Sequence, residues 1–185
     1  MEPLVRLLLT TFHETCRSRD MKTERGFTLV ELMVTLAVAA ILLTVGVPSM
    51  TNLIKNNRLT AATNAFVSSL NLARSEAVKQ GRDAVLCVGD QNGCTAGTWA
   101  GGWAVLVDSD RNNSFDPAEV QRVSEPLQNT VVVTTAFNSF QFDATGAVNN
   151  TGPFKFCDDR AGNLGRQLQI FSTGSVLLTT QVPCP

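Results

Sequence analysis

A run of apolar residues near the start of the chain constrains its fold more than any other feature. Residues 27–47 consist almost entirely of Phe, Leu, Val, Ala, Ile, Met, Thr and Gly, and Glu31 is the only ionisable side chain among them. In a helix, about 21 residues extend roughly 30 Å, which is one crossing of a bilayer. The run therefore predicts a membrane-spanning helix. The carboxylate of Glu31 needs a partner, because a charge in hydrocarbon costs about 3 kcal/mol.

The residues around the apolar run do not follow the pattern of an ordinary secretory signal. Such a signal places a cleavage site of small residues after its apolar region. Here the run ends at Pro48 without such a site, and Gly26 directly precedes it. Cleavage after Gly26 creates an amino group on Phe27, one helical turn before Glu31, and this is the nearest cation for the carboxylate. The alternative interpretation is a plain membrane anchor that carries an unpaired glutamate.

The sequence Gly-Phe-Thr-Leu-Val-Glu-Leu at residues 26–32 resembles the class III signal of type IV pilins and type II secretion pseudopilins. The resemblance implies that prepilin peptidase cleaves between Gly26 and Phe27 and that Phe27 is N-methylated. It also implies that the helix packs with other major and minor pilins or pseudopilins in a filament core, where Glu31 pairs with the Phe27 amino group of a neighbouring subunit. Before assembly such a chain crosses the inner membrane once, with its head in the periplasm. After assembly it belongs to an extracellular filament.

Residues 1–26 are accordingly interpreted as a leader peptide. Met21 offers a second start, and residues 1–20 show no signal architecture, so they indicate either a mis-assigned start or an unusually long leader. Removal of the leader also removes Cys16 and His13, the only histidine. Since the chain has no tyrosine either, the mature protein lacks the imidazole that most hydrolases use as a base, and we do not expect an enzyme.

The rest of the chain divides into a helical and a β-rich part. Residues 27–48 are expected to form the membrane and filament-core helix, and residues 49–81 its amphipathic continuation up to Gly81. The continuation carries an apolar stripe at three- and four-residue steps, formed by Leu59, Ala62, Phe66, Leu70, Ala73 and Ala77. Residues 82–185 contain short β-prone runs separated by turn residues, which predict an all-β head. These runs are residues 83–89, 101–107, 119–125, 130–137, 140–148, 153–159, 166–172 and 175–180.

The order of these segments is similar to that of the FimT/GspH-type minor pilins and pseudopilins. The resemblance implies an α+β fold in which a long N-terminal helix packs on a β-sandwich head of two antiparallel sheets. It also implies a low-abundance subunit that primes or caps a filament. We expect a minor pilin of a type IV pilus, located near the filament tip. The alternatives are a minor pseudopilin of a type II secretion system and a DNA-binding minor pilin of natural transformation.

Four of the five cysteines follow the leader, namely Cys87, Cys94, Cys157 and Cys184. An even number in an oxidising compartment predicts two disulfides, for which the sequence allows three connectivities. We favour Cys87–Cys94, which closes a short turn, together with Cys157–Cys184, which ties the C-terminus to a strand. No Cys-x-x-Cys sequence occurs, and this argues against a zinc ribbon or thioredoxin-like chemistry.

The acidic segment from Asp108 to Glu119 has the oxygen spacing of an EF-hand calcium loop. Its candidate calcium ligands are Asp108, Asp110, Asn112, the carbonyl of Ser114, Asp116 and Glu119. The favoured interpretation is instead a turn whose Asp and Asn side chains bond their own backbone. We therefore expect no cofactor, with calcium at this loop as the alternative.

Some FimT-type minor pilins bind DNA through a Gly-Arg-x-Arg element near the C-terminus. At the matching place this chain has Ser175 and Leu177 instead of the two arginines. Lys155, Arg160 and Arg166 are the remaining candidates for a DNA-binding patch. Residues 27–185 carry ten basic and twelve acidic side chains, so long-range attraction to DNA is absent and DNA is an unfavoured partner.

Overall fold

The computed structural model describes residues 26–128 and 130–185, so the proposed leader lies outside the described residues except for Gly26. The first element is the helix α2 (Leu29–Gln80), which continues through Pro48. The backbone N–H of Glu31 donates to the hydroxyl of Thr28 at 3.2 Å, which caps the start of the helix. Gly81 follows its end with φ of 64°, a left-handed conformation that suits glycine. The chain divides into two compact units between Val47 and Pro48, and each is described by itself.

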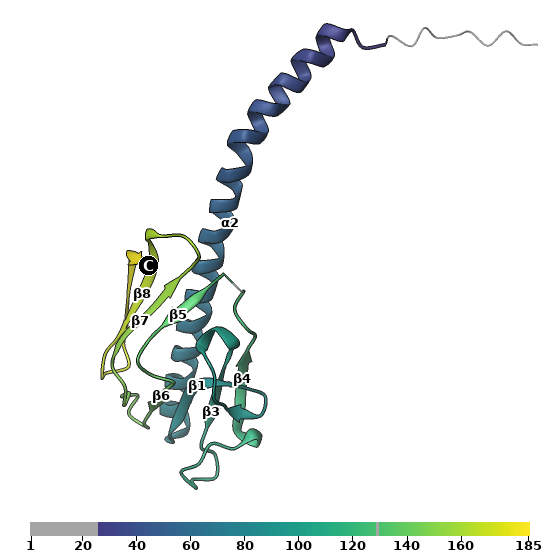
Figure 1. Cartoon of the computed structure of the whole chain (residues 1–185). Helices are drawn as coiled ribbons and strands as arrows, with labels where there is room; N and C mark the ends of the chain where they lie inside the picture. Colours follow the sequence, from purple (N-terminus) through teal and green to yellow (C-terminus); the bar gives the residue numbers. More distant parts are fainter. Residues whose placement is uncertain (1–25, 129) are drawn as a thin grey trace, which may run out of the picture. The chain divides into compact units, whose positions relative to one another are not determined.

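The second unit contains two antiparallel sheets beside residues 48–80 of α2 (Figure 1). In the first sheet the order is β2-β1-β3-β4, and β6 also pairs with β1. In the second sheet the order is β5-β7-β8-β9. The first sheet contains β1 (Ala84–Asp90), β2 (Gly93–Cys94), β3 (Trp103–Val107), β4 (Val120–Ser124) and β6 (Ser139–Phe142). The second contains β5 (Val132–Thr134), β7 (Gly152–Cys157), β8 (Gly162–Ile170) and β9 (Val176–Cys184). Two short 3-10 helices lie in the connections between strands, η1 (Trp99–Gly101) after β2 and η2 (Pro117–Glu119) after β3.

The α+β fold expected from the sequence is confirmed. Each of the eight predicted β-prone runs overlaps a strand, although β8 begins four residues before its run, and the two-residue strand β2 is not predicted by the sequence pattern. The last predicted run is too short, because β9 continues to Cys184. The helix ends one residue before the predicted stop at Gly81.

The predicted apolar stripe of α2 is buried at all six positions, where it contacts both sheets in one core. Phe66 lies at the centre of this core. Its ring stacks on that of Phe154 from the second sheet, with centroids 3.9 Å apart, and meets Trp103 from the first sheet edge-on at 5.5 Å. Aromatic pairs in such arrangements contribute beyond the apolar area that they bury. The helix, rather than direct sheet-to-sheet packing alone, therefore joins the two sheets.

A second, smaller apolar cluster lies on the opposite face of the first sheet. It contains Val85 and Cys87 from β1 and Ala104 and Leu106 from β3, and Phe115 of the acidic loop packs against it. Since β1 is buried on both faces, its residues are apolar without alternation. The segment from Asp108 to Glu119 therefore packs on the outer face of this sheet through Phe115.

Candidate functional site

The described part of the first unit is an uncovered apolar helix. All residues from 29 to 47 are exposed, and the segment is long and apolar enough to cross a membrane by its length and composition. Phe27 precedes it with 79% of its surface exposed. Large exposed apolar patches mark interaction or membrane surfaces, since water otherwise selects against them. This segment is the first candidate functional site, an assembly and membrane surface.

Glu31 lies in the first turn of this helix. Carboxylates at this position are stabilised by the partial positive charge of the helix N-terminus. Gly26 is exposed, and a side-chain atom at its position would meet nothing within 4 Å. Cleavage after Gly26 and pairing of Glu31 with an amino group stay predictions.

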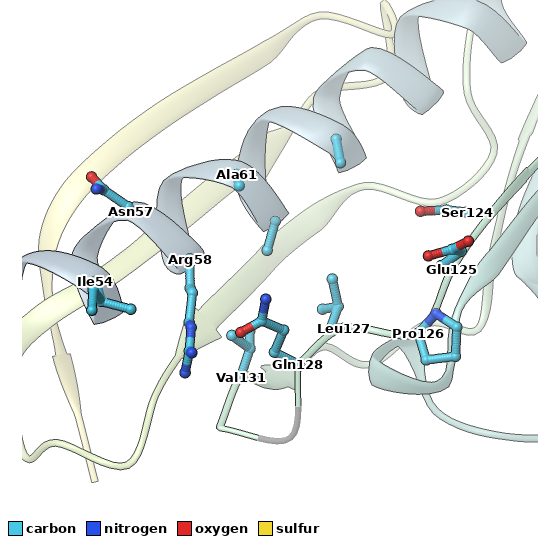
Figure 2. A pocket seen from close by; sticks show the side chains of 12 residues that line it. Ile54, Asn57, Arg58, Ala61, Ser124, Glu125, Pro126, Leu127, Gln128 and Val131 are labelled. Carbon is cyan, nitrogen blue, oxygen red and sulfur yellow. The ribbon is translucent and has the colours of Figure 1, made fainter. Parts of the chain in front are cut away.

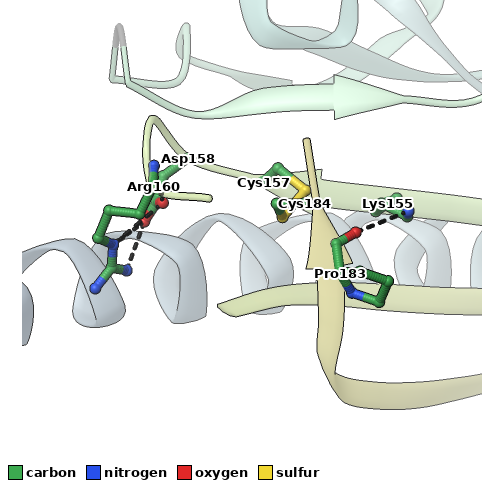
Figure 3. The surroundings of a disulfide bond; sticks show 6 residues. All are labelled: Lys155, Cys157, Asp158, Arg160, Pro183 and Cys184. Carbon is green, nitrogen blue, oxygen red and sulfur yellow. Dashed lines mark hydrogen bonds and ion pairs between the residues drawn. A yellow bond between two sulfur atoms is a disulfide. The ribbon is translucent and has the colours of Figure 1, made fainter. Parts of the chain in front are cut away.

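Two disulfides hold the head, and they are the pairs that the sequence favours. Cys87 and Cys94 have Cα atoms 5.6 Å apart, and those of Cys157 and Cys184 are 5.8 Å apart. The second bond joins β7 to β9 (Figure 3), although β8 lies between these strands in the sheet. It crosses β8 at Gly165, where an added Cβ would lie 2.6 Å from the sulfur of Cys184. Gly165 therefore leaves the space that the disulfide and the neighbouring backbone occupy, a link that the sequence pattern does not reveal.

The three candidate DNA-binding residues do not form a free cationic patch. Arg160 bonds Asp158 at 2.6 Å and the side-chain oxygen of Asn56 at 2.9 Å. Arg166 donates to the hydroxyl of Thr60 at 2.7 Å, and Lys155 donates to a backbone carbonyl of β9 at 3.1 Å. The two arginines thus connect the second sheet to α2, which is a structural role.

A polar ladder on α2 receives these contacts. Asn52, Asn56 and Thr60 follow one another at four-residue steps and all accept hydrogen bonds from Arg160 or Arg166. Lys55, on the same stretch of helix, forms an ion pair with Asp159 at 2.8 Å. The sequence pattern does not reveal this ladder, because polar residues beside an apolar stripe are also what a solvated helix face contains.

The ion pair also changes the titration of Asp158. Burial of the Asp158 carboxylate opposes its ionisation, but hydrogen bonds from the side chain and backbone of Arg160, together with its charge, outweigh this effect. The pKa of Asp158 consequently lies below its ordinary value of 3.8. The charged form is the one that the fold stabilises.

In the acidic loop, the carboxylate oxygens of Asp108, Asp110 and Glu119 lie within 4.8 Å of one another. These oxygens accept hydrogen bonds from backbone N–H groups of the same loop. Glu119 accepts backbone N–H groups of Ser109 at 2.5 Å and of Asp116 at 3.2 Å. Burial opposes ionisation of Glu119, yet hydrogen bonds from Asp116, Ser109 and Asp110 hold its pKa below the ordinary value.

The other candidate calcium ligands bond within the same loop. Asp108 accepts the backbone N–H groups of Asn112 and Asn113, both at 3.1 Å. The side-chain amide of Asn112 bonds Asp110 and Asp116, and its oxygen accepts the N–H of Ser114 at 2.7 Å. Asn113, at the position of the usual EF-hand glycine, has φ of 58°. These hydrogen bonds are of the kind expected for a turn whose Asp and Asn side chains bond their own backbone, whereas the absence of a cofactor stays a prediction.

A groove of about 620 Å³ lies between α2 and the segment after β4 (Figure 2). The helix lines one side with Ile54, Asn57, Arg58, Ala61, Ala62 and Ala65. The facing side consists of residues 124–128 and Val131. This groove could not be predicted from the sequence, since it depends on how residues without a periodic pattern fold back toward the helix.

Comparisons with known proteins match both units. The family model "Type II transport protein GspH" matches residues 62–174. The model "Prokaryotic N-terminal methylation motif" matches residues 21–47. No curated protein matches the chain significantly.

Among solved structures, the type IV minor pilin FimU of Pseudomonas aeruginosa is similar in two crystal forms. In one form the identity is 23% and the TM-score 0.54, over 69% of this chain and 92% of FimU. In the other the identity is 25% and the TM-score 0.52, over 66% of this chain and 94% of FimU. The minor pseudopilin EpsH of the Vibrio cholerae type II secretion system matches at 12% identity with a TM-score of 0.41, over 70% of this chain and 99% of EpsH.

The family model covers more than half of the chain, from the C-terminal part of α2 through most of both sheets. The methylation motif covers the exposed apolar segment that precedes them. The chain therefore belongs to the GspH family of minor pilins and pseudopilins.

Proposed function

We propose that this chain is a minor pilin of a type IV pilus that primes assembly at the inner membrane and lies near the filament tip. The observation that carries the proposal is the likeness to FimU, a type IV minor pilin, over 94% of the FimU chain at 25% identity. The uncovered apolar helix with a methylation motif supports it, because a filament core supplies the cover that this helix lacks.

The proposed mechanism is structural rather than catalytic. In the membrane, Glu31 carries an insertion cost of about 3 kcal/mol. In the filament, its carboxylate pairs with the methylated amino group of Phe27 on a neighbouring subunit, so the cost is removed. Transfer from bilayer to filament is thereby favoured for a helix that holds a glutamate at this position.

Prepilin peptidase is the proposed processing enzyme, and its product begins with N-methylated Phe27. Intact-mass analysis of the chain isolated from membranes tests this step. Detection of an assembled subunit that still begins at Met1 or Met21 would rule out the processing at Gly26.

A minor pseudopilin of a type II secretion system is the second candidate, which the description of the matching family favours. Deletion of the gene in its host, followed by counts of surface pili and by assay of secreted enzymes, separates the two. We expect loss of pili with normal secretion. Loss of secretion with normal pili would replace the proposal by the second candidate, and loss of neither would overturn both. Nothing among the residues that the structure describes favours the DNA-binding alternative.

A further inference from the structure

The groove between α2 and the facing residues 124–128 and Val131 contains an arginine, Arg58, without a partner among the described residues. Arg58 lies on α2, half-buried, and its guanidinium forms no hydrogen bond or ion pair with any other residue that the structure describes. Figure 2 shows its side chain extending from the helix toward the facing segment, which carries Gln128 and Val131. By contrast, Lys55, Arg160 and Arg166 nearby are all engaged. Arg58 is therefore available to an anion from outside the chain.

The remaining lining of the groove is mainly apolar. Ala61 and Ala65 form an exposed floor of small side chains on α2, and Leu127 and Val131 from the facing segment are anchored in the main core. Glu125 lies exposed at the rim and forms no ion pair with Arg58. A partner that covers this groove buries apolar surface and removes water from Arg58. Because a desolvated cation without a counter-charge is costly, the partner must bring a carboxylate.

The spacing of the lining residues on α2 indicates the shape of the partner. The lining residues Ile54, Arg58, Ala61 and Ala65 follow one another at steps of four, three and four residues on one side of the helix, and Met50 lies four residues before Ile54, outside the groove lining. Met50 and Ile54 are large apolar side chains with 58% and 43% of their surface exposed. Steps of three and four are those of helix-to-helix seams, and small residues allow two helices to approach closely. A helix also satisfies its own backbone hydrogen bonds, so it can lie in an apolar groove.

We propose that this groove receives a helix of a neighbouring filament subunit, a different pilin or pseudopilin chain, with an Asp or Glu of that helix paired to Arg58. The inference rests on the proposed function, because it takes the chain to be part of a filament. It deepens that function by assigning a side of the head unit to a partner. Arg58 then selects among neighbours, since a helix with a lysine or no charge at this position leaves the guanidinium unpaired.

Photo-cross-linking in the native host tests the proposal on the full-length chain. A benzophenone amino acid replaces Ala61 in the groove or, as the matched control, Asn71, which is exposed ten residues further along the same helix and does not line the groove. We expect the Ala61 position to yield a cross-linked peptide from the N-terminal helix of another pilin or pseudopilin. A peptide from a strand or loop of a head, a peptide from a second copy of this chain, or no cross-link would overturn the proposal.

Variants test the charge and the fit separately. Ala61→Trp fills the groove and Arg58→Glu reverses its charge, and each should lower the amount of chain in sheared filaments on the order of tenfold. Arg58→Lys and Asn71→Trp should assemble at nearly the normal level. Since Ala61 and Asn71 are both exposed, neither Trp disturbs the core, and the cellular level of each variant checks this. Normal assembly of Ala61→Trp or Arg58→Glu would overturn the groove proposal.

The failures of the two proposals are distinguishable. If the chain acts in secretion, the cross-linked helix comes from a pseudopilin, so the groove assignment stands while the pilus assignment fails. If deletion abolishes pili but Ala61→Trp assembles normally, the pilus assignment stands while the groove assignment fails.

Discussion

Arg160 bonds Asp158 at 2.6 Å and, through the same terminal nitrogen, reaches the side-chain oxygen of Asn56 on α2 at 2.9 Å. One guanidinium thus stabilises the turn after β7 and fixes that turn to the helix. The side chain of Asp158 is 2% exposed and that of Arg160 14%. Loss of the arginine leaves a buried carboxylate without its counter-charge.

We therefore predict that Arg160→Ala destabilises the head unit, residues 48–185, by about 2–3 kcal/mol, because breaking a buried ion pair costs more than an exposed one. Urea unfolding measures the change. Lys79→Ala is the matched control, since its ion pair with Glu76 leaves the lysine 74% exposed, and its unfolding midpoint should stay near that of the parent. Equal effects of the two substitutions would contradict the role assigned to Arg160.

Stability of the head unit should fall at acid pH through Glu119 and Asp158. Both have a pKa below the ordinary value, which is 4.5 for Glu119 and 3.8 for Asp158. Groups with a lowered pKa stabilise the fold fully above the ordinary value, and this contribution is lost as the pH falls through the lower, folded-state pKa. The urea midpoint should thus be steady from pH 7 to about 5 and decline below about 4.5. In Glu119→Gln the decline should be shallower, and an unchanged slope would exclude Glu119 as a contributor.

The two disulfides should differ in what they contribute. The residues of Cys87–Cys94 are 7 positions apart and those of Cys157–Cys184 are 27 apart. On the loop-entropy model these closures stabilise by about 2.5 and about 3.6 kcal/mol, so replacing both cysteines of the longer loop by alanine should cost about 1 kcal/mol more. Urea unfolding of the two double variants tests the order. A larger loss for the shorter loop would show that packing of Cys87 in the second apolar cluster outweighs the entropy term.

Sequence periodicity was sufficient to predict the helix, its buried stripe and the approximate positions of eight of the nine strands, because each of these has a pattern set by the face that meets the core. The stripe from Leu59 to Ala77 is the clearest example. Periodicity could not reveal the use of Gly165 under the disulfide or of Arg160 against α2. Both depend on segments that are distant in sequence and close in space. For the same reason the sequence offered Arg160 and Arg166 as a DNA-binding patch, although their partners are on the helix.

Gly174 is a position where even the smallest side chain should be damaging. Its φ is 72°, and an added Cβ would overlap the carbonyl oxygen of Gly146 and lie 3.0 Å from Nε of Arg74. We predict that Gly174→Ala costs about 2–3 kcal/mol, from the left-handed conformation and from overpacking against backbone. Gly101→Ala is the control, since a Cβ there meets nothing within 4 Å and its φ is not in the left-handed range. Equal thermal midpoints for the two variants would contradict the prediction.

Glu31 lies in the first turn of an apolar helix that no described residue covers. If its carboxylate serves assembly, Glu31→Val should behave in opposite ways in the two environments. Insertion into the membrane should be at least as efficient, because a cost of about 3 kcal/mol is removed. Recovery in filaments should fall sharply, because the amino group of Phe27 loses its partner. Glu31→Asp, which keeps the charge on a shorter side chain, is the matched control and should retain part of the assembly. Quantification of the chain in membranes and in sheared filaments measures both effects, and normal assembly of Glu31→Val would show that the carboxylate has another purpose.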